Sequence, residues 1–394
     1  MTPGDYRTWR TYAVKIGARE YQVATKPGVL SHGLLDPAAV LLAEHVVVER
    51  GDTVVHLNCG NGLVGVVASI AGGAGRIVLA DRNVLSVAAA ERTLAANGVA
   101  NAQVMLAHGV VGLAGEADSV AIRIPQERVA LLQLLVNAFA ILKPEGRCYI
   151  AGATNEGIKT AARTLEKLFG NARVLSRDSS HRVLSAVKRT ASVPTDGEFA
   201  NPYLDADAFH ALDATLRGTR YQLYTRPGVF SWDHIDEATT ILADVMQVEP
   251  GNTVLDLGCG CGALGTVAAS LAGRGQVTMV DADVEAVRSA RKSAEANGLA
   301  SIRVLSSDVA GAVLAERFDA VVTNPPFHVG KATDLDVPTQ FMLDAWTVLN
   351  DGGRLFLVAN RTLPYERTIK QRFGNVANLH DGPRFKVLTA TREG

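Results

Sequence analysis

The sequence has few of the features that hold together small secreted proteins or membrane proteins. It contains only four cysteines among 394 residues, too few for a disulfide framework. Its longest apolar stretch, residues 129–142, includes Gln133 and Asn137 and is too short to span a bilayer. The first residues show no basic segment followed by an apolar one, as a signal peptide would. We therefore expect a soluble, cytoplasmic protein.

The sequence also lacks an excess of charge of either sign. Lys and Arg number 39, Asp and Glu number 40, and the net charge is -1. No overall field attracts a polyanion, so any role on nucleic acid must depend on local clusters of basic side chains. What is present is ordinary for a globular protein, since 47% of the residues are apolar and 20% are charged. The length predicts two or three domains.

The chain repeats itself at an offset of 200 residues. The segment Lys26–Ser31 (KPGVLS) recurs as Arg226–Ser231 (RPGVFS), and Asp81 recurs as Asp281. A period this long is typical of a duplicated domain and not of a solenoid. We predict a first domain over residues 1–190, a linker rich in Pro, Gly, Ser and Asp over residues 191–203, and a second domain over residues 204–394.

Each copy alternates strand-like and helix-like segments. In the second copy we expect strands at 253–257, 276–280, 302–305, 320–323 and 353–359, and helices at 263–271, 283–297 and 341–349. Strands separated by helices imply a mostly parallel sheet with helices on both faces. The predicted fold class is therefore α/β, with two tandem Rossmann-like domains.

A glycine-rich loop follows the first predicted strand of the second copy and opens a helix. It reads DLGCGCG over residues 256–262, and its glycines let a ligand approach the main chain closely. The glycines at 260, 262 and 265 with Asp281 also fit a dinucleotide fingerprint, which leaves an NAD-dependent oxidoreductase open. However, Asp256 stands two positions before the first glycine, where a pyrophosphate would be repelled. A ligand with a positive charge and an amino group suits this acid better.

Two further acids end predicted strands. Asp281 is placed to accept hydrogen bonds from ribose hydroxyls, although a helix cap or a solvated strand end would look the same in sequence. Asp308, next to Ser307, is placed to accept a hydrogen bond from an adenine amine. Cys259 and Cys261 have no further Cys or His cluster nearby, so we predict no metal site.

The motif Asn324-Pro325-Pro326-Phe327 follows the fourth predicted strand. Two prolines stop the strand and remove two N–H donors, which leaves the Asn324 side-chain oxygen and the Pro325 carbonyl as acceptors. Two converging acceptors can hold an –NH2 group, and Phe327 offers a flat face for stacking a base. This arrangement suits alkylation of an exocyclic amine, because hydrogen bonds to both N–H groups help localise its lone pair. An ordinary strand terminator is the structural alternative.

With these motifs, the second copy resembles the class I S-adenosylmethionine-dependent methyltransferases. The NPPF-His motif, the PGVFS segment and Leu-Pro-Tyr at 363–365 are similar to the ribosomal RNA guanine-N2 methyltransferases, above all to the two-domain small-subunit type, and the likeness covers the whole chain. One departure is Ala238, where the family usually has Gly. The resemblance implies S-adenosyl-L-methionine as cofactor and ribosomal RNA or a ribosomal subunit as partner of a monomer. It assigns catalysis to Asn324, Pro325, Pro326 and Phe327, and cofactor binding to Asp256, Gly258, Gly260, Gly262, Asp281, Asp308 and Asn324.

The first copy lacks most of these residues. His56 stands at the position of Asp256, Asn58 at that of Gly258, His108 at that of Asp308, and Arg123-Ile-Pro-Gln126 at that of the NPPF motif. We predict a non-catalytic first domain that either supports the second or binds RNA and shields the active domain. Residues 155–189 carry eight Lys or Arg and three acids, which favours RNA binding.

Other functions remain compatible with the motifs. The same fold could methylate a different amine, such as a large-subunit rRNA guanine, a DNA base or a protein glutamine. A non-catalytic RNA-binding assembly factor with a vestigial site is the alternative outside enzymology, although the intact acids and Asn324 of the second copy argue against it.

Overall fold

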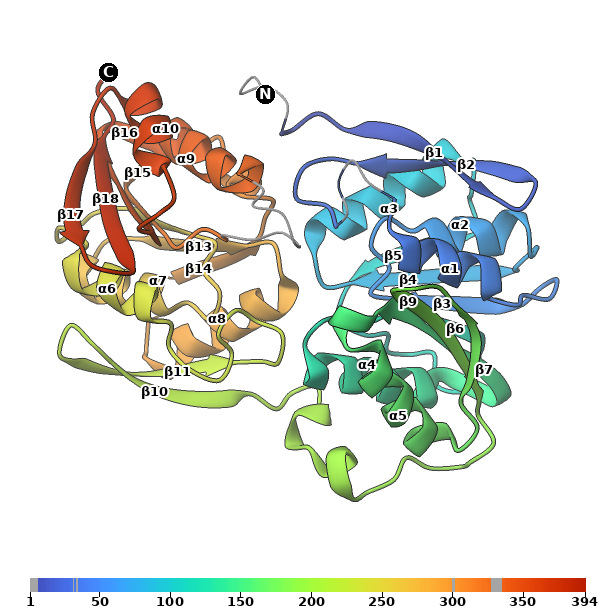
Figure 1. Ribbon diagram of the computed structural model, residues 1–394. Coiled ribbons are helices and arrows are strands. Elements are labelled where there is room, and N and C mark those ends of the chain that lie inside the picture. The colour runs from blue at the N-terminus through green and yellow to red at the C-terminus, as the bar shows by residue number, and fades with distance from the viewer. Residues whose placement is uncertain (1–5, 31, 33–34, 300–301, 327–334) are drawn as a thin grey trace. The chain divides into compact units, whose positions relative to one another are not determined.

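The computed structural model describes residues 6–30, 32, 35–299, 302–326 and 335–394 (Figure 1). Two compact units make up the chain: a first unit of residues 7–208, and a second unit in which Tyr6 joins residues 209–394. A seven-stranded sheet lies at the centre of each unit. The predicted linker, residues 191–203, packs with the first unit, where Phe199 is buried.

The first unit has the strand order β5-β4-β3-β6-β7-β9-β8, and a separate hairpin pairs β1 with β2. Its elements are β1 (Arg10–Ile16), β2 (Arg19–Thr25), α1 (Pro37–His45), β3 (Thr53–Leu57), α2 (Leu63–Ile70), β4 (Arg76–Asp81), α3 (Val84–Ala96), β5 (Ala102–Leu106), β6 (Ala117–Arg123), α4 (Arg128–Ile141), β7 (Leu142–Ala153), α5 (Ile158–Phe169), β8 (Arg173–Arg177) and β9 (His181–Val187).

The second unit repeats this arrangement, with the strand order β14-β13-β12-β15-β16-β18-β17 and the hairpin β10-β11. Its elements are β10 (His210–Leu216), β11 (Thr219–Thr225), α6 (Glu237–Val245), β12 (Val254–Leu257), α7 (Ala263–Ala272), β13 (Val277–Asp281), α8 (Val284–Ala296), β14 (Ile302–Ser306), β15 (Phe318–Thr323), α9 (Asp336–Val348), β16 (Leu349–Asn360), α10 (Tyr365–Phe373), β17 (Ala377–Asp381) and β18 (Phe385–Thr391).

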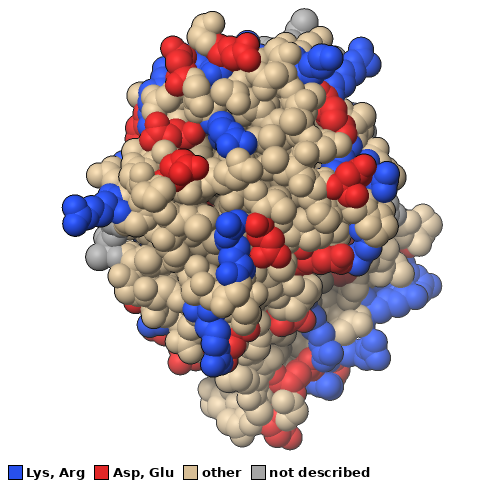
Figure 2. All heavy atoms as spheres, turned by 90° about the vertical axis from the view of Figure 1, so that its left-hand side faces the viewer, with Lys and Arg blue, Asp and Glu red and all other residues tan. Residues whose placement is uncertain are grey.

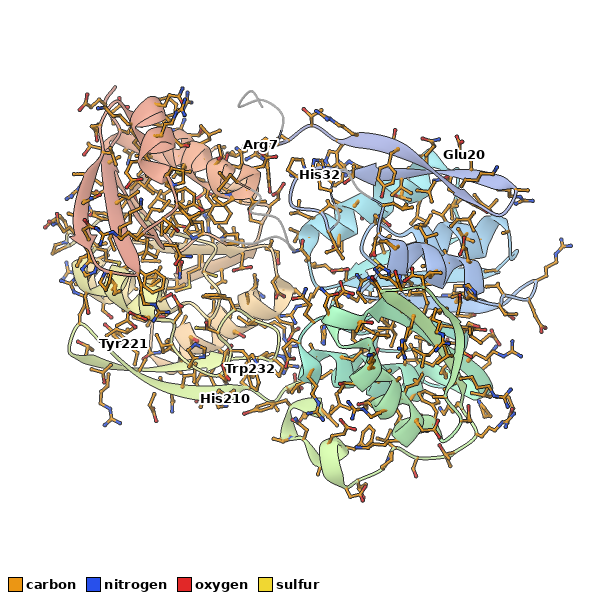
Figure 3. All side chains as sticks on the ribbon, viewed as in Figure 1. Arg7, Glu20, His32, His210, Tyr221 and Trp232 are labelled. Atoms are coloured by element: carbon orange, nitrogen blue, oxygen red, sulfur yellow. The ribbon has the colours of Figure 1, made fainter. Side chains whose placement is uncertain are left out.

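The predicted alternation of strands and helices is confirmed, and the sheet is mostly parallel. Strands β12 to β16 pair in parallel, whereas β18 runs antiparallel to both β16 and β17. The sequence did not reveal the antiparallel edge or the hairpin β10-β11. Helix α9 begins at Asp336, five residues before the predicted start at Phe341. In the hairpin, Tyr221 is buried, and the ring of His210 meets that of Trp232 edge-on at 5.6 Å (Figure 3).

Each sheet is buried on both faces, as parallel strands require. In β12, Val254 belongs to a core shared with α6, α7 and α8, whereas Leu255 and Leu257 belong to a core shared with α9 and α10. This packing fixes β12, β13, β14 and β15 side by side in parallel. The loops that follow these strands carry the sequence motifs and therefore meet at one edge of the sheet.

On the face in Figure 2, Lys and Arg side chains are interspersed with Asp and Glu, so this face shows no single-sign field. All four cysteines have free thiols. Among the described helices, none has the length and apolar character needed to cross a membrane.

Candidate functional site

Asp256 lies at the centre of the site, inside strand β12. Its side chain is fully buried, and Oδ2 accepts a hydrogen bond of 2.7 Å from the Gly265 amide. Its Oδ1 is buried too and has no hydrogen-bond partner within the described part of the chain. Burial raises the pKa of Asp256 to about 7. A buried acceptor without a donor is costly, so this position suits a ligand that brings a donor or a positive charge.

The loop after β12 needs its glycines for two reasons. Gly258, Gly260 and Gly262 have φ values of 79°, 54° and 85°, in the region that favours glycine. A side chain at Gly258 would lie 2.9 Å from the ring of Phe341. By contrast, a side chain at Gly260 would meet nothing within 4 Å among the described atoms. The loop is therefore packed against the core at Gly258 and open at Gly260, where a ligand can reach the main chain.

Asp281 ends β13 and holds the glycine loop. Its two carboxylate oxygens accept hydrogen bonds of 2.9 Å from the amides of Gly260 and Asp283. The first unit contains the same pair of bonds, in which Asp81 accepts from Gly60 and Asn83 at 2.9 Å. The acid thus has a structural role in both units. Asp281 is partly exposed. Its carboxylate can therefore also accept a hydrogen bond from a ligand.

Asp308 follows β14 in a tightly held turn. The next residue, Val309, has a φ of 49°, a strained conformation for a β-branched side chain. Ser307 Oγ donates to the Val309 carbonyl at 2.7 Å, and the Ala310 amide donates to Asp344 Oδ2 at 3.1 Å. Backbone strain of this kind is kept where the surroundings over-determine it, which happens at binding sites.

Asn324 follows β15 and is oriented by two partners. Its Nδ2 donates to Asp236 Oδ2 and to Thr239 Oγ1, each at 3.0 Å. Its Oδ1 is buried and has no hydrogen-bond partner among the described residues. The carboxamide is thus fixed by its nitrogen with its oxygen left as an acceptor. Pro325 is buried and Pro326 exposed, whereas Phe327 and His328 lie outside the described residues.

Sequence analysis missed the two residues that orient Asn324. Asp236 caps the N-terminus of α6, where its Oδ2 accepts hydrogen bonds from the amide and the hydroxyl of Thr239. In the sequence, this stretch differs from the family's usual pattern at Ala238, which is fully buried. An Asp-x-x-Thr pattern before a helix predicts a cap, but it does not predict a second bond to a residue 88 positions away.

The first unit fills the corresponding position with an ion pair. The strand register shows which residues are equivalent. His56 on β3 pairs with Ala121 on β6, and the corresponding Asp256 on β12 pairs with Val322 on β15. Arg123 and Asn324 each stand two residues after these partners and therefore occupy equivalent places. Arg123 Nε donates to Asp36 Oδ2 at 2.9 Å, and its Nη1 donates to Glu156 Oε2 at 2.8 Å. The Arg123 side chain is 7% exposed, so this place holds a charge that its own neighbours neutralise.

Two further positions of the first unit, His56 and Asn58, differ from their counterparts Asp256 and Gly258. His56 is buried with neither ring nitrogen hydrogen-bonded in the described structure, and burial lowers its pKa to about 3. His56 is therefore neutral, whereas the second unit has an acid, Asp256, at the same position. Asn58 adopts a φ of 53°, and its Nδ2 donates to the Arg123 carbonyl at 2.6 Å. The first unit thus carries a side chain at the position of Gly258, where the second unit packs the ring of Phe341 against the loop.

A metal centre finds no support in this geometry. Across the ranges that the structure describes, no three His, Cys, Asp or Glu side chains gather as metal ligands. Cys259 and Cys261 flank Gly260, and burial raises the pKa of the Cys261 thiol to about 11. These thiols are small, protonated side chains among glycines.

Comparison with known proteins shows the family to which the chain belongs. The family model described as "Methyltransferase small domain" matches residues 20–185 and, a second time, residues 220–389. The chain belongs to this family. The double match confirms the duplication, and the family confirms the class I methyltransferase fold predicted from the motifs.

Members of the family with established names are similar over most of the chain. The ribosomal RNA small subunit methyltransferase C of Hahella chejuensis is 35% identical over 276 residues, which cover 70% of this chain and 78% of that protein. The protein of the same name from Pseudomonas aeruginosa is 32% identical over 278 residues, with coverages of 71% and 80%. A solved structure, the 16S rRNA N2 G1207 methyltransferase (RsmC) of T. thermophilus in complex with AdoMet and guanosine, covers 100% of both chains with a TM-score of 0.84 and 30% identity.

Proposed function

We infer that the protein transfers a methyl group from S-adenosyl-L-methionine to the exocyclic N2 amine of a guanine in small-subunit ribosomal RNA. The observation that carries this proposal is the fixed Asn324 carboxamide, whose Oδ1 is a buried acceptor with no partner among the described residues. The relatives named for small-subunit rRNA, and the solved structure with guanosine, favour this amine over a DNA base or a protein glutamine.

The edge of the second sheet suits the cofactor. Three acids, Asp256, Asp281 and Asp308, lie at or near the carboxyl ends of adjacent parallel strands, and Asp281 accepts a hydrogen bond from the amide of the open Gly260. We assign the unpartnered Asp256 Oδ1 to the charged methionine end, Asp281 to the ribose and Asp308 to the adenine amine. When bound, S-adenosyl-L-methionine supplies an electrophilic methyl group on a sulfonium. An anionic pocket matches that positive charge.

The residues of the NPPF motif would prepare the amine for attack. Asn324 Oδ1 and the Pro325 carbonyl accept its two N–H groups, which weakens the delocalisation of the lone pair into the guanine ring. Asp236 and Thr239 hold Asn324 in this orientation before the base arrives, so little reorganisation is needed. As the nitrogen bonds the methyl carbon, the bond from that carbon to sulfur breaks and its electron pair leaves with the neutral thioether. The nitrogen then releases one proton to water, so transfer requires no base beforehand. We expect Phe327 to stack on the base.

We propose that the first unit binds RNA and not the cofactor. Arg123, Asn58 and His56 fill or neutralise the equivalent site. Helix α5 presents Lys159 and Arg163 on the exposed surface, where they can contact phosphates. All proposed site residues belong to one chain, so a monomer suffices, acting in the cytoplasm where small subunits are made.

The test compares ribosomal RNA from cells with and without the protein. Mass spectrometry of nucleosides from separated subunits should show N2-methylguanosine lost from the small subunit only. Reintroduced wild-type protein should restore it, and the Asn324→Ala variant should not. Loss from the large subunit, or an unchanged profile, would refute the proposed substrate.

A further inference from the structure

A tyrosine at the start of the chain lies in the proposed cofactor site. Tyr6 belongs to the second unit, although 202 residues of the first unit follow it directly in the sequence. Its hydroxyl donates a hydrogen bond of 2.7 Å to Asp308 Oδ1, across a separation of 302 residues. The ring is 5% exposed and belongs to the apolar core on the α9 and α10 face of the sheet. Tyr6 is therefore docked by its ring and hydrogen-bonded by its hydroxyl.

The partner of Tyr6 lies in the most constrained turn of the site. Val309 holds its left-handed backbone while Ser307 bonds its carbonyl and Asp344 bonds the amide of Ala310. These bonds fix the main chain directly after Asp308, at Val309 and Ala310. The hydrogen bond from Tyr6 acts on the Asp308 carboxylate itself. A carboxylate can accept about four hydrogen bonds, so this contact leaves capacity for a ligand amine.

We propose that Tyr6 is a positioning residue for the adenine end of the cofactor, which orients the Asp308 carboxylate to accept the adenine amine. This inference rests on the proposed role of Asp308 in cofactor binding. It makes Tyr6, which precedes the first unit in the sequence, part of the cofactor site of the second. The first unit has no equivalent pair, since Ala206 stands 200 positions after Tyr6 and His108 stands at the position of Asp308.

The hydroxyl can be removed while the docked ring is kept. In the full-length protein, Tyr6→Phe should raise the Kd of S-adenosyl-L-methionine about 10-fold, the scale of a lost hydrogen bond to a charged group. Tyr6→Phe should weaken binding of the inosine analogue of the cofactor, in which a carbonyl oxygen replaces the adenine amine, much less. The KM for the cofactor should rise, with kcat at saturation and the KM for RNA unchanged. Calorimetry and steady-state kinetics measure these quantities.

Two controls separate positioning from general stability. Tyr224→Phe also removes one hydroxyl bond in the second unit, to Gln222 Oε1 at 3.0 Å, and should leave cofactor affinity unchanged. In an Asp308→Asn background, Tyr6→Phe should add less than about a twofold loss, because both changes act on one interaction. A purely structural role would give the same loss in both backgrounds and would overturn the proposal.

The remaining outcomes are also decisive. Unchanged cofactor affinity in Tyr6→Phe would refute the inference, and tighter binding would mean that Tyr6 obstructs the site. If the wild-type protein itself fails to bind S-adenosyl-L-methionine, the proposed function fails, which is a different result from a silent Tyr6 variant.

Discussion

The two units share one fold and differ at the edge of the sheet where ligands bind. Both keep the acid that ties the glycine loop to the second strand, Asp81 in one and Asp281 in the other, with the same two backbone bonds. Asp81 is 4% exposed, whereas Asp281 is more open. Both units therefore keep the anchor of the glycine loop, and they differ in how far this acid is exposed.

The equivalent positions 123 and 324 show the difference in energetic terms. Arg123 is bonded to Asp36 and Glu156, so that the first unit satisfies its own buried charges. Asn324 is bonded only through its nitrogen, and its buried oxygen has no partner among the described residues. An unsatisfied buried acceptor costs about 1–3 kcal/mol. The second unit thus keeps a destabilising feature that a substrate amine would relieve, whereas the first unit has replaced it with an ion pair.

The largest effect is expected from breaking the ion pair in the first unit. Arg123→Met leaves the buried Asp36 and the partly buried Glu156 without their cation, and should lower the free energy of unfolding by about 3 kcal/mol. Denaturant-induced unfolding measures this loss, with Arg189→Met, which removes an exposed ion pair with Glu145, as the control. Cofactor affinity should stay within a few-fold of wild type. A stable Arg123→Met protein that binds a second equivalent of S-adenosyl-L-methionine would contradict our account of the first unit.

The equivalent change in the second unit should affect rate and not stability. Asn324→Ala removes the amine acceptor, and should slow methyl transfer by about 10²-fold or more, the effect of losing one well-placed polar group. Cofactor affinity should change by no more than a few-fold. Single-turnover transfer to small-subunit RNA, with cofactor binding measured in parallel, tests both parts. A near-normal rate would remove Asn324 from the chemical step.

Because His56 in the first unit aligns with Asp256 in the second, we expect the stability and the cofactor affinity to depend on pH in the second unit only. The pKa of Asp256 is about 7 in the folded protein, against an ordinary value of 3.8, so between these values the folded apo protein holds a proton that the unfolded chain has released. Its stability therefore falls as pH rises through this window. A cationic cofactor favours the ionised acid, so affinity should rise about 10-fold between pH 6 and 8, with proton release.

Calorimetry in buffers of different ionisation enthalpy measures both the affinity and the released proton. In Asp256→Asn, which cannot ionise, the affinity should be lower and independent of pH over the same range. His56→Asn, the matched change in the first unit, should leave the wild-type pH profile of cofactor binding intact. A pH-independent wild-type affinity would remove Asp256 from the cofactor site.

The smallest effect concerns RNA binding by the first unit. Replacing Lys159 and Arg163 by Ala should weaken RNA binding several-fold. It should also make the slope of log K against log salt shallower by about one to two, because each lost cation leaves one phosphate no longer neutralised by the protein. Arg128 and Lys167 are the matched control, because both contact Glu198 at 3.0–3.1 Å and their charge is partly compensated. Filter binding over a series of salt concentrations distinguishes the two pairs. Equal slopes for both variants would leave the first unit as a scaffold.

The sequence by itself determined the duplication and the fold class, and it predicts which copy carries the chemistry. It could do so because glycines with positive φ, paired prolines and acids at strand ends are local requirements, readable in the order of the residues. The parallel strands β12 to β16 were predicted from their spacing. The antiparallel strands β17 and β18 were not, since a short connection joins them and no helix between them marks where each begins.

Only the tertiary structure decided which side chains act together. Asp236 and Thr239 orient Asn324 from nearly 90 residues away, and Tyr6 reaches Asp308 from the other end of the chain. No spacing rule predicts such pairs, because they depend on which helix packs on which face of the sheet. The sequence therefore determined where the acids and acceptors of the site stand along the chain. The packing of the core determined how they are oriented, because long-range hydrogen bonds exist only once the sheet and its helices are in place.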